Sequence, residues 1–158
     1  MKIKLAINGR EKAFSIDPGE KLLDLLRREG YMGVKKGCGS GDCGACAVLL
    51  NGRAVNSCLV FAARADGSEI LTVEGLATGE TLHPIQSAFL SEGAIQCGYC
   101  TPGMLISTVD LLSRNPDPTE GEIREALSGN LCRCTGYVKQ VRAVQRAAEM
   151  MKGGGIDV

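Results

Sequence analysis

The sequence predicts an α+β protein, with a mixed sheet and one helix in residues 1–76 and a four-helix bundle in residues 77–158. Apolar and polar residues alternate in the first part, as expected for half-buried strands. Asn-Gly pairs separate these strands and are typical of two-residue hairpin turns. Beyond Gly75 the apolar residues recur at the spacing of amphipathic helices. A length of 158 residues fits one domain or two small ones.

The strands of the first part are bounded by clear turn signals. Asn8-Gly9 and Asn51-Gly52 each predict a hairpin, and Pro18-Gly19 ends the second strand. A leucine-rich helix over residues 22–29 follows, and Gly30 is placed to end it. Strands are expected at residues 3–7, 13–16, 47–50, 55–61 and 70–73, the fourth of which includes Cys58.

The second part predicts four helices. Pro84 suits the first turn of a helix that ends near Glu92, with His83 as a surface or capping residue. Thr101-Pro102 predicts the next helix start, and the Asn115-Pro116 pair ends that helix. Thr119 and Glu122 form the pattern of a capping box for the third helix. The last helix is expected over residues 137–152, before a frayed tail at residues 153–155.

Eight cysteines fall into two groups of four. The N-terminal quartet is Cys38, Cys43, Cys46 and Cys58, in which the first three follow the spacing C-x4-C-x2-C within a glycine-rich loop. This is the plant-type ligand pattern of a [2Fe–2S] cluster. Zinc sites usually combine C-x2-C pairs or histidines, a Rieske centre needs two histidines, and the chain has one. Disulfides are not expected without a secretion signal.

The C-terminal quartet is Cys97, Cys100, Cys132 and Cys134. Its two pairs lie in the first and last loops between the predicted helices, which fall at the same end of an antiparallel bundle. Cys100 precedes a helix, whose dipole is expected to stabilise an anionic sulfur. The spacing itself is compatible with iron or zinc, and a C-x2-C redox pair would leave the other two cysteines unexplained.

Composition limits the function classes. The formal net charge is +0, which argues against a nucleic-acid-binding protein. The N-terminal residues alternate in polarity and do not resemble a signal peptide, and no apolar run is long enough to cross a membrane. We therefore expect a soluble, cytoplasmic protein.

Three stretches closely resemble the small iron–sulfur subunit of the xanthine oxidase (molybdenum hydroxylase) family. They are Gly37–Cys46, Gln96–Met104 with the sequence QCGYCTPGM, and Gly129–Tyr137 with the sequence GNLCRCTGY. The resemblance covers about residues 2–150. It implies a plant-ferredoxin-like β-grasp domain and a helical-bundle domain, each with one [2Fe–2S] cluster held by one quartet, and so favours iron over zinc.

The resemblance also implies partners and a role. A large subunit is expected to bind molybdopterin and a further subunit to bind FAD, while this chain relays electrons one at a time through its two clusters. Gln96 and Cys134 match family positions that touch the pterin. The chain would thus be the non-substrate-binding subunit of a molybdenum-dependent oxidoreductase, with no catalytic residue of its own.

Other chemistry-bearing residues have simpler explanations. Asp42 is expected to be a solvated loop residue, and Tyr99 a packing residue between helices. Lys35-Lys36 is most simply a solvated face. Two other functions stay open at this point, a freestanding ferredoxin-like electron carrier and a zinc module or redox sensor.

Overall fold

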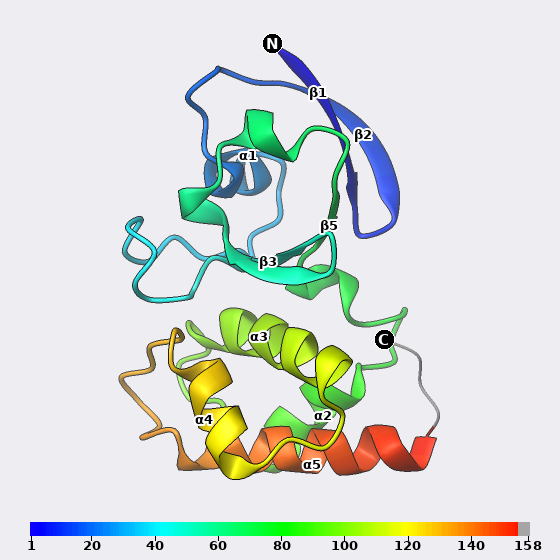
Figure 1. Cartoon of the computed structure of the whole chain (residues 1–158), viewed down its shortest axis with the longest axis vertical. Helices are drawn as coiled ribbons and strands as arrows, with labels where there is room; N and C mark the ends of the chain where they lie inside the picture. Colours follow the sequence, from blue (N-terminus) through cyan, green and yellow to red (C-terminus); the bar gives the residue numbers. More distant parts are fainter. Residues whose placement is uncertain (155–158) are drawn as a thin grey trace.

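The computed structural model describes residues 1–154, so the part of the predicted tail at Gly155 lies outside the described residues. A sheet and one helix form one half of the molecule, and helices α2 to α5 form the other (Figure 1). Strand β3 and helix α3 face each other where the two halves meet. This arrangement agrees with the predicted mixed sheet followed by a helical part.

The five strands are ordered β2-β1-β5-β3-β4 in one sheet. Strands β1 and β5 are parallel, and the other neighbours are antiparallel. Both predicted Asn-Gly hairpins are confirmed, because Asn8, Gly9, Asn51 and Gly52 all have positive φ angles, as a type I′ turn requires. The strands are β1 (Lys2–Ile7), β2 (Arg10–Ser15), β3 (Ala47–Leu50), β4 (Arg53–Asn56) and β5 (Glu69–Leu71).

The prediction that Cys58 lies on a strand is wrong. Strand β4 ends at Asn56, and Cys58 lies in the short 3-10 helix η1 (Ser57–Leu59). The Ser57 hydroxyl donates a 2.7 Å hydrogen bond to the Cys46 carbonyl, and this bond helps to turn the chain away from the sheet. Two further 3-10 helices, η2 (Ala62–Ala65) and η3 (Val73–Gly75), flank β5.

Helix α1 (Leu22–Arg28) packs its leucines into the core of the first half. Leu22, Leu23, Leu25 and Leu26 are all buried together with alternate residues of β1. The side chains of β1 alternate between buried and exposed or half-buried positions, as expected for a strand with one face on a core.

The four helices of the second half begin and end close to the predicted residues. They are α2 (Pro84–Ser91), α3 (Thr101–Arg114), α4 (Glu120–Leu127) and α5 (Val138–Gly154). Helix α3 already includes Thr101, so Cys100 occupies the cap position. Helix α5 continues through Gly153, which was predicted to be frayed, because the roughly 1 kcal/mol cost of a glycine is too small to end a helix by itself.

Two predicted caps are confirmed. The Thr119 hydroxyl accepts a hydrogen bond from the Glu122 N–H, and the Glu122 carboxylate accepts one from the Thr119 N–H. His83 caps α2 in the same reciprocal way, since its Nδ1 accepts from the Ile85 N–H and its own N–H donates to Gln86. These side chains satisfy N–H groups that have no partner within the helix.

Strand β3 belongs to both cores. Val48 is buried in the core of the first half, whereas Ala47 and Leu49 are buried in the core of the helices. Successive side chains of a strand point to opposite faces, so a single strand can join the two cores. Within residues 1–154, no helix is long and apolar enough to cross a membrane.

Candidate metal centres in two cysteine quartets

The N-terminal quartet lies in the loop before β3 and in η1. Cys46 and Cys58 are buried, Cys43 is half-buried and Cys38 is exposed. Backbone N–H groups point at the sulfurs of this loop: the N–H of Ser40 lies 3.4 Å from Cys38 Sγ, and that of Cys38 lies 3.4 Å from Cys43 Sγ. Such N–H groups stabilise negative charge on sulfur.

Glycine is needed where this loop is tightest. A Cβ atom at Gly37 would lie 2.6 Å from Cys43 Sγ. Gly44 has a φ of +70°, and a Cβ there would collide with the backbone carbonyl of Gly129 in the helical half. The first glycine therefore leaves room for a thiol, and the second allows close contact between the two halves.

The thiols of this quartet form two pairs. Cys38 contacts Cys43, and Cys58 contacts Cys46. Hydrogen bonds from Ser40 lower the pKa of the exposed Cys38 thiol to about 6. Burial, with the neighbouring Cys46, raises the pKa of the Cys58 thiol to about 11. The buried thiol therefore keeps its proton at neutral pH unless a cation replaces it.

The C-terminal quartet forms two pairs as well, and each pair joins the α2–α3 loop to the α4–α5 loop. The sulfurs of Cys97 and Cys134 lie 3.6 Å apart, and the Cys100 thiol hydrogen-bonds to Cys132. The two loops thus lie at the same end of the helices, as predicted (Figure 1). Cys97 and Cys134 are exposed, whereas Cys100 and Cys132 are half-buried.

Burial and a second thiol oppose the expected effect of the helix start on Cys100. Burial and the adjacent Cys132 raise the pKa of the Cys100 thiol to about 12, and they outweigh the backbone hydrogen bond at the start of α3, which lowers it. Burial also opposes ionisation of Cys132, but hydrogen bonds from Thr135 outweigh it and lower the pKa of that thiol to about 7. The neighbouring Cys97 raises the pKa of Cys134.

The pairwise arrangement suits a binuclear centre. A [2Fe–2S] cluster is held by four thiolates, and two close pairs can supply two thiolates to each of its irons. The paired thiols of both quartets, and the N–H groups that face the sulfurs of the N-terminal loop, therefore fit such a cluster.

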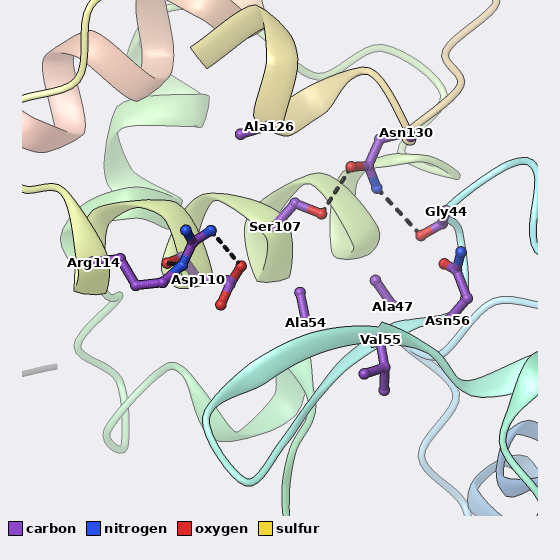
Figure 2. A pocket seen from close by; sticks show the side chains of 11 residues that line it. Gly44, Ala47, Ala54, Val55, Asn56, Ser107, Asp110, Arg114, Ala126 and Asn130 are labelled. Carbon is purple, nitrogen blue, oxygen red and sulfur yellow. Dashed lines mark hydrogen bonds and ion pairs between the residues drawn. The ribbon is translucent and has the colours of Figure 1, made fainter. Parts of the chain in front are cut away.

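The two quartets are linked by hydrogen bonds between their loops. The N–H of Leu131, the residue before Cys132, donates a 2.9 Å bond to the carbonyl of Cys43. The adjacent Asn130 donates through Nδ2 to the Gly44 carbonyl, and its Oδ1 accepts from Ser107 (Figure 2). A cysteine of one quartet is therefore connected to a cysteine of the other through one hydrogen bond and the intervening backbone.

Tyr99 takes part in the same contact between the halves. Its hydroxyl donates a 2.7 Å hydrogen bond to the Lys36 carbonyl just before the N-terminal loop, and its side chain is about half exposed. The prediction that Tyr99 packs between helices is therefore wrong. Asp42 is exposed, as predicted.

A polar cavity of about 230 Å³ lies between β3 and β4 on one side and α3 and α4 on the other (Figure 2). Asp110 lies at its edge, with Oδ2 2.9 Å from Arg114 and Oδ1 3.2 Å from Nε of Arg53 on β4. The approach of Arg53 lacks the geometry of a hydrogen bond, so Oδ1 accepts none from the described residues. The Arg53–Asp110 ion pair therefore adds an electrostatic contact between the halves.

One residue near the C-terminal quartet, Gln140, carries no sequence signal of its own. Gln140 on α5 is fully buried and contacts both Thr135 and Cys132 Sγ. It occupies the apolar stripe of α5 by helical spacing, but a polar residue in an apolar stripe does not by itself reveal its partner. Gln96, in contrast, is exposed immediately before Cys97, at the same end of the helices as Cys134.

Two family models match the chain. Residues 5–77 match a 2Fe-2S iron-sulfur cluster binding domain, and residues 72–145 match a [2Fe-2S] binding domain. The chain is 50% identical to the nicotinate dehydrogenase small FeS subunit of Eubacterium barkeri, over 93% of this chain and 94% of the relative. It is 48% identical to the xanthine dehydrogenase iron-sulfur-binding subunit of Escherichia coli O157:H7, over 90% and 91% of the two chains.

Solved structures give the same result. Quinoline 2-oxidoreductase from Pseudomonas putida 86 superposes with a TM-score of 0.94 at 43% identity, over 99% of this chain and 98% of that chain. Aldehyde oxidoreductase from Desulfovibrio gigas superposes with a TM-score of 0.93 at 41% identity, but the match spans 97% of this chain and only 17% of that one. The equivalent segment is thus part of a much longer polypeptide there.

A ferredoxin-like sheet half and a helical half, each matched by a [2Fe–2S] family, define an iron–sulfur protein of the electron-transfer class. The chain belongs to the small iron–sulfur subunits of the xanthine oxidase, or molybdenum hydroxylase, family. Its role is electron transfer within an oxidoreductase complex.

Proposed function

We propose that this subunit holds two [2Fe–2S] clusters and relays electrons one at a time between a molybdopterin site on a large partner and FAD on another. The observation that carries the proposal is the sorting of eight thiols into two quartets of two close pairs each. Cys38, Cys43, Cys46 and Cys58 would bind one cluster, and Cys97, Cys100, Cys132 and Cys134 the other.

The clusters supply one-electron redox chemistry when bound, and the chain sets the conditions for it. Backbone N–H groups in the Cys38 loop donate toward sulfur and stabilise the added negative charge of a reduced cluster. Burial of Cys46 and Cys58 keeps water from that side of the site. The Leu131–Cys43 hydrogen bond holds together the two loops that carry the quartets and would hold the clusters.

The exposure of particular sulfurs supports the proposed positions of the partners. Cys134 and the nearby Gln96 are exposed at the C-terminal quartet, which supports a contact of these two residues with the pterin of a large subunit. Cys38 is exposed at the N-terminal quartet, where an FAD-bearing subunit would accept electrons. The chain would act as two domains, a β-grasp domain in residues 1–76 and a four-helix bundle in residues 77–158. A cytoplasmic setting would keep its eight thiols reduced.

Metal analysis tests the two-cluster assignment. The purified subunit should contain about four irons and about four sulfides per chain, because each [2Fe–2S] cluster holds two of each. In the reduced protein, Cys132→Ser should remove one EPR signal, Cys46→Ser should remove the other, and each should leave the remaining signal intact. About two irons per chain, or a colourless zinc protein, would contradict the proposal.

Co-purification separates the proposed subunit from a freestanding electron carrier. The subunit should be recovered with a molybdenum-containing partner when it is purified from its native source at low salt. Recovery of the fully loaded chain alone, together with rapid reduction by unrelated enzymes, would favour the freestanding carrier.

A further inference from the structure

We propose that Thr135 and Gln140 form a hydrogen-bond relay to Cys132 that raises the reduction potential of the C-terminal cluster above the value set by its thiolates alone. The inference rests on the proposed function, because it requires a cluster at this quartet. It concerns two residues that bind neither iron nor a partner.

The relay is built from short contacts. Thr135 Oγ1 lies 3.0 Å from Cys132 Sγ. Gln140 Nε2 lies 2.5 Å from the same Oγ1 and 3.7 Å from Cys132 Sγ, and Gln140 Oε1 lies 2.8 Å from that Oγ1, where it can accept the hydroxyl proton. Gln140 is fully buried, so water does not compete for its amide.

Binding of a cluster would fix the direction of these hydrogen bonds. A free thiol can donate its proton to the Thr135 hydroxyl, but a thiolate ligand can only accept. With Cys132 as a thiolate, the hydroxyl donates to Sγ, and its oxygen can then accept from the Gln140 amide. The thiolate thereby takes the hydroxyl proton that Gln140 Oε1 can otherwise accept, and hydrogen bonds in a chain from amide to hydroxyl to sulfur strengthen one another.

The surrounding backbone holds this relay in place. The Cys132 N–H donates a 2.8 Å hydrogen bond to the Tyr137 hydroxyl, which closes the loop that contains Thr135. Tyr137 itself has a φ of +68°, a conformation that a non-glycine residue adopts only when its surroundings impose it. Strain in this loop is therefore offset by the contacts that position the hydroxyl against the sulfur.

The electrostatic consequence is a shift of one potential. Reduction adds negative charge to the cluster and its ligands, so donors to a ligand sulfur stabilise the reduced state more than the oxidised state. The N-terminal quartet has N–H donors from its own loop but no buried side-chain relay of this kind among the described contacts. Loss of the relay should therefore affect the C-terminal cluster and not the other.

Potentiometric EPR titration of the purified protein with both clusters tests the relay. Thr135→Val removes the hydroxyl at nearly constant volume and should lower the reduced-to-oxidised ratio of the C-terminal cluster about tenfold at a fixed potential, equivalent to about 59 mV. Gln140→Leu should shift the same signal in the same direction by a smaller amount. Thr135→Ser should restore the wild-type potential.

Thr108→Val is the matched control. Thr108 is a threonine of the helical half that is fully buried, whereas Thr135 is half-buried, and the Thr108 hydroxyl donates to the Met104 carbonyl rather than to a cysteine. It should leave both potentials unchanged. If Thr135→Val shows both EPR signals at unchanged potentials, the relay is overturned. If neither Thr135→Val nor Gln140→Leu binds the second cluster, these residues act in cluster assembly and the relay is likewise overturned. Absence of a second cluster in the wild-type protein would instead refute the proposed function.

Discussion

Replacement of Gly103 by alanine tests whether the two halves are held together by close backbone contact. Gly103 lies in the first turn of α3, and a Cβ at this position would collide with the carbonyl oxygen of Gly44 in the N-terminal cysteine loop. The obstructing atom belongs to the backbone, so no side-chain rotation can relieve the collision. The two halves must move apart, or α3 must shift.

The expected cost follows from overpacking. An extra methyl group in a well-packed region lowers the free energy of unfolding by about 1–3 kcal/mol. For a chain of 158 residues this corresponds to a decrease in Tm of about 2–12 °C. The Leu131–Cys43 hydrogen bond lies in the same contact, so the magnetic interaction between the two reduced clusters should weaken as well.

Gly121→Ala is the matched control. Gly121 lies in the first turn of α4, where an added Cβ would meet only Thr119 Oγ1 at 3.9 Å. Alanine should stabilise this helix by about 0.5–1 kcal/mol. Circular dichroism melts and EPR spectra of both variants decide the question. The reasoning is refuted if Gly103→Ala melts at or above the wild-type temperature, with unchanged EPR spectra, while Gly121→Ala is stabilised.

Three further predictions concern other contacts. Burial lowers the pKa of His83 below its ordinary 6.5, because it disfavours the charged imidazolium. The neutral His83 side chain therefore contributes fully to the free energy of unfolding above pH 6.5, and this contribution is lost as the pH falls through the lowered pKa. Chemical denaturation from pH 7 to 5 should show this loss in the wild type and not in His83→Asn. In urea titrations, Asp110→Asn should lower the free energy of unfolding by about 1 kcal/mol, and by less at high salt. Arg124→Gln, which removes an exposed ion pair, should leave the free energy of unfolding almost unchanged in the same titrations. Thr119→Ala should lower the free energy of unfolding by about 1 kcal/mol in thermal melts, because it removes the capping hydroxyl. Thr119→Ser keeps this hydroxyl, so an equal loss of stability in the two variants would contradict the capping role.

Local sequence signals predicted the elements of this fold because their causes are local. The Asn-Gly turns need positive φ angles at two adjacent residues, and the Thr119 cap joins residues three apart. The spacing of Cys38, Cys43 and Cys46 likewise reflects one loop. Family resemblance then supplied what spacing alone left open for the C-terminal quartet.

The incorrect or missing predictions involve contacts between distant residues. Tyr99 donates to Lys36, 63 residues away, and an aromatic residue in an inter-helix loop gives no sign of such a partner. Cys58 leaves the strand because Ser57 bonds to Cys46 across 11 residues. Gln140 has the helical spacing of a core residue, but only its folded surroundings show the Thr135 hydroxyl and the sulfur that make its burial favourable.

The position of the two quartets relative to each other depends on the register of β3. Cys46 directly precedes this strand, whose Val48 faces the core of the first half while Ala47 and Leu49 face the helices. A shift by one residue would exchange these faces and bury each side chain in the wrong core. Because such a shift is unfavourable in both cores, the strand fixes the cysteine loop against α3, where the Leu131–Cys43 hydrogen bond joins the two halves. The apolar run Ala47–Leu50, which predicts a strand in the sequence, therefore also determines how closely the two cysteine quartets approach.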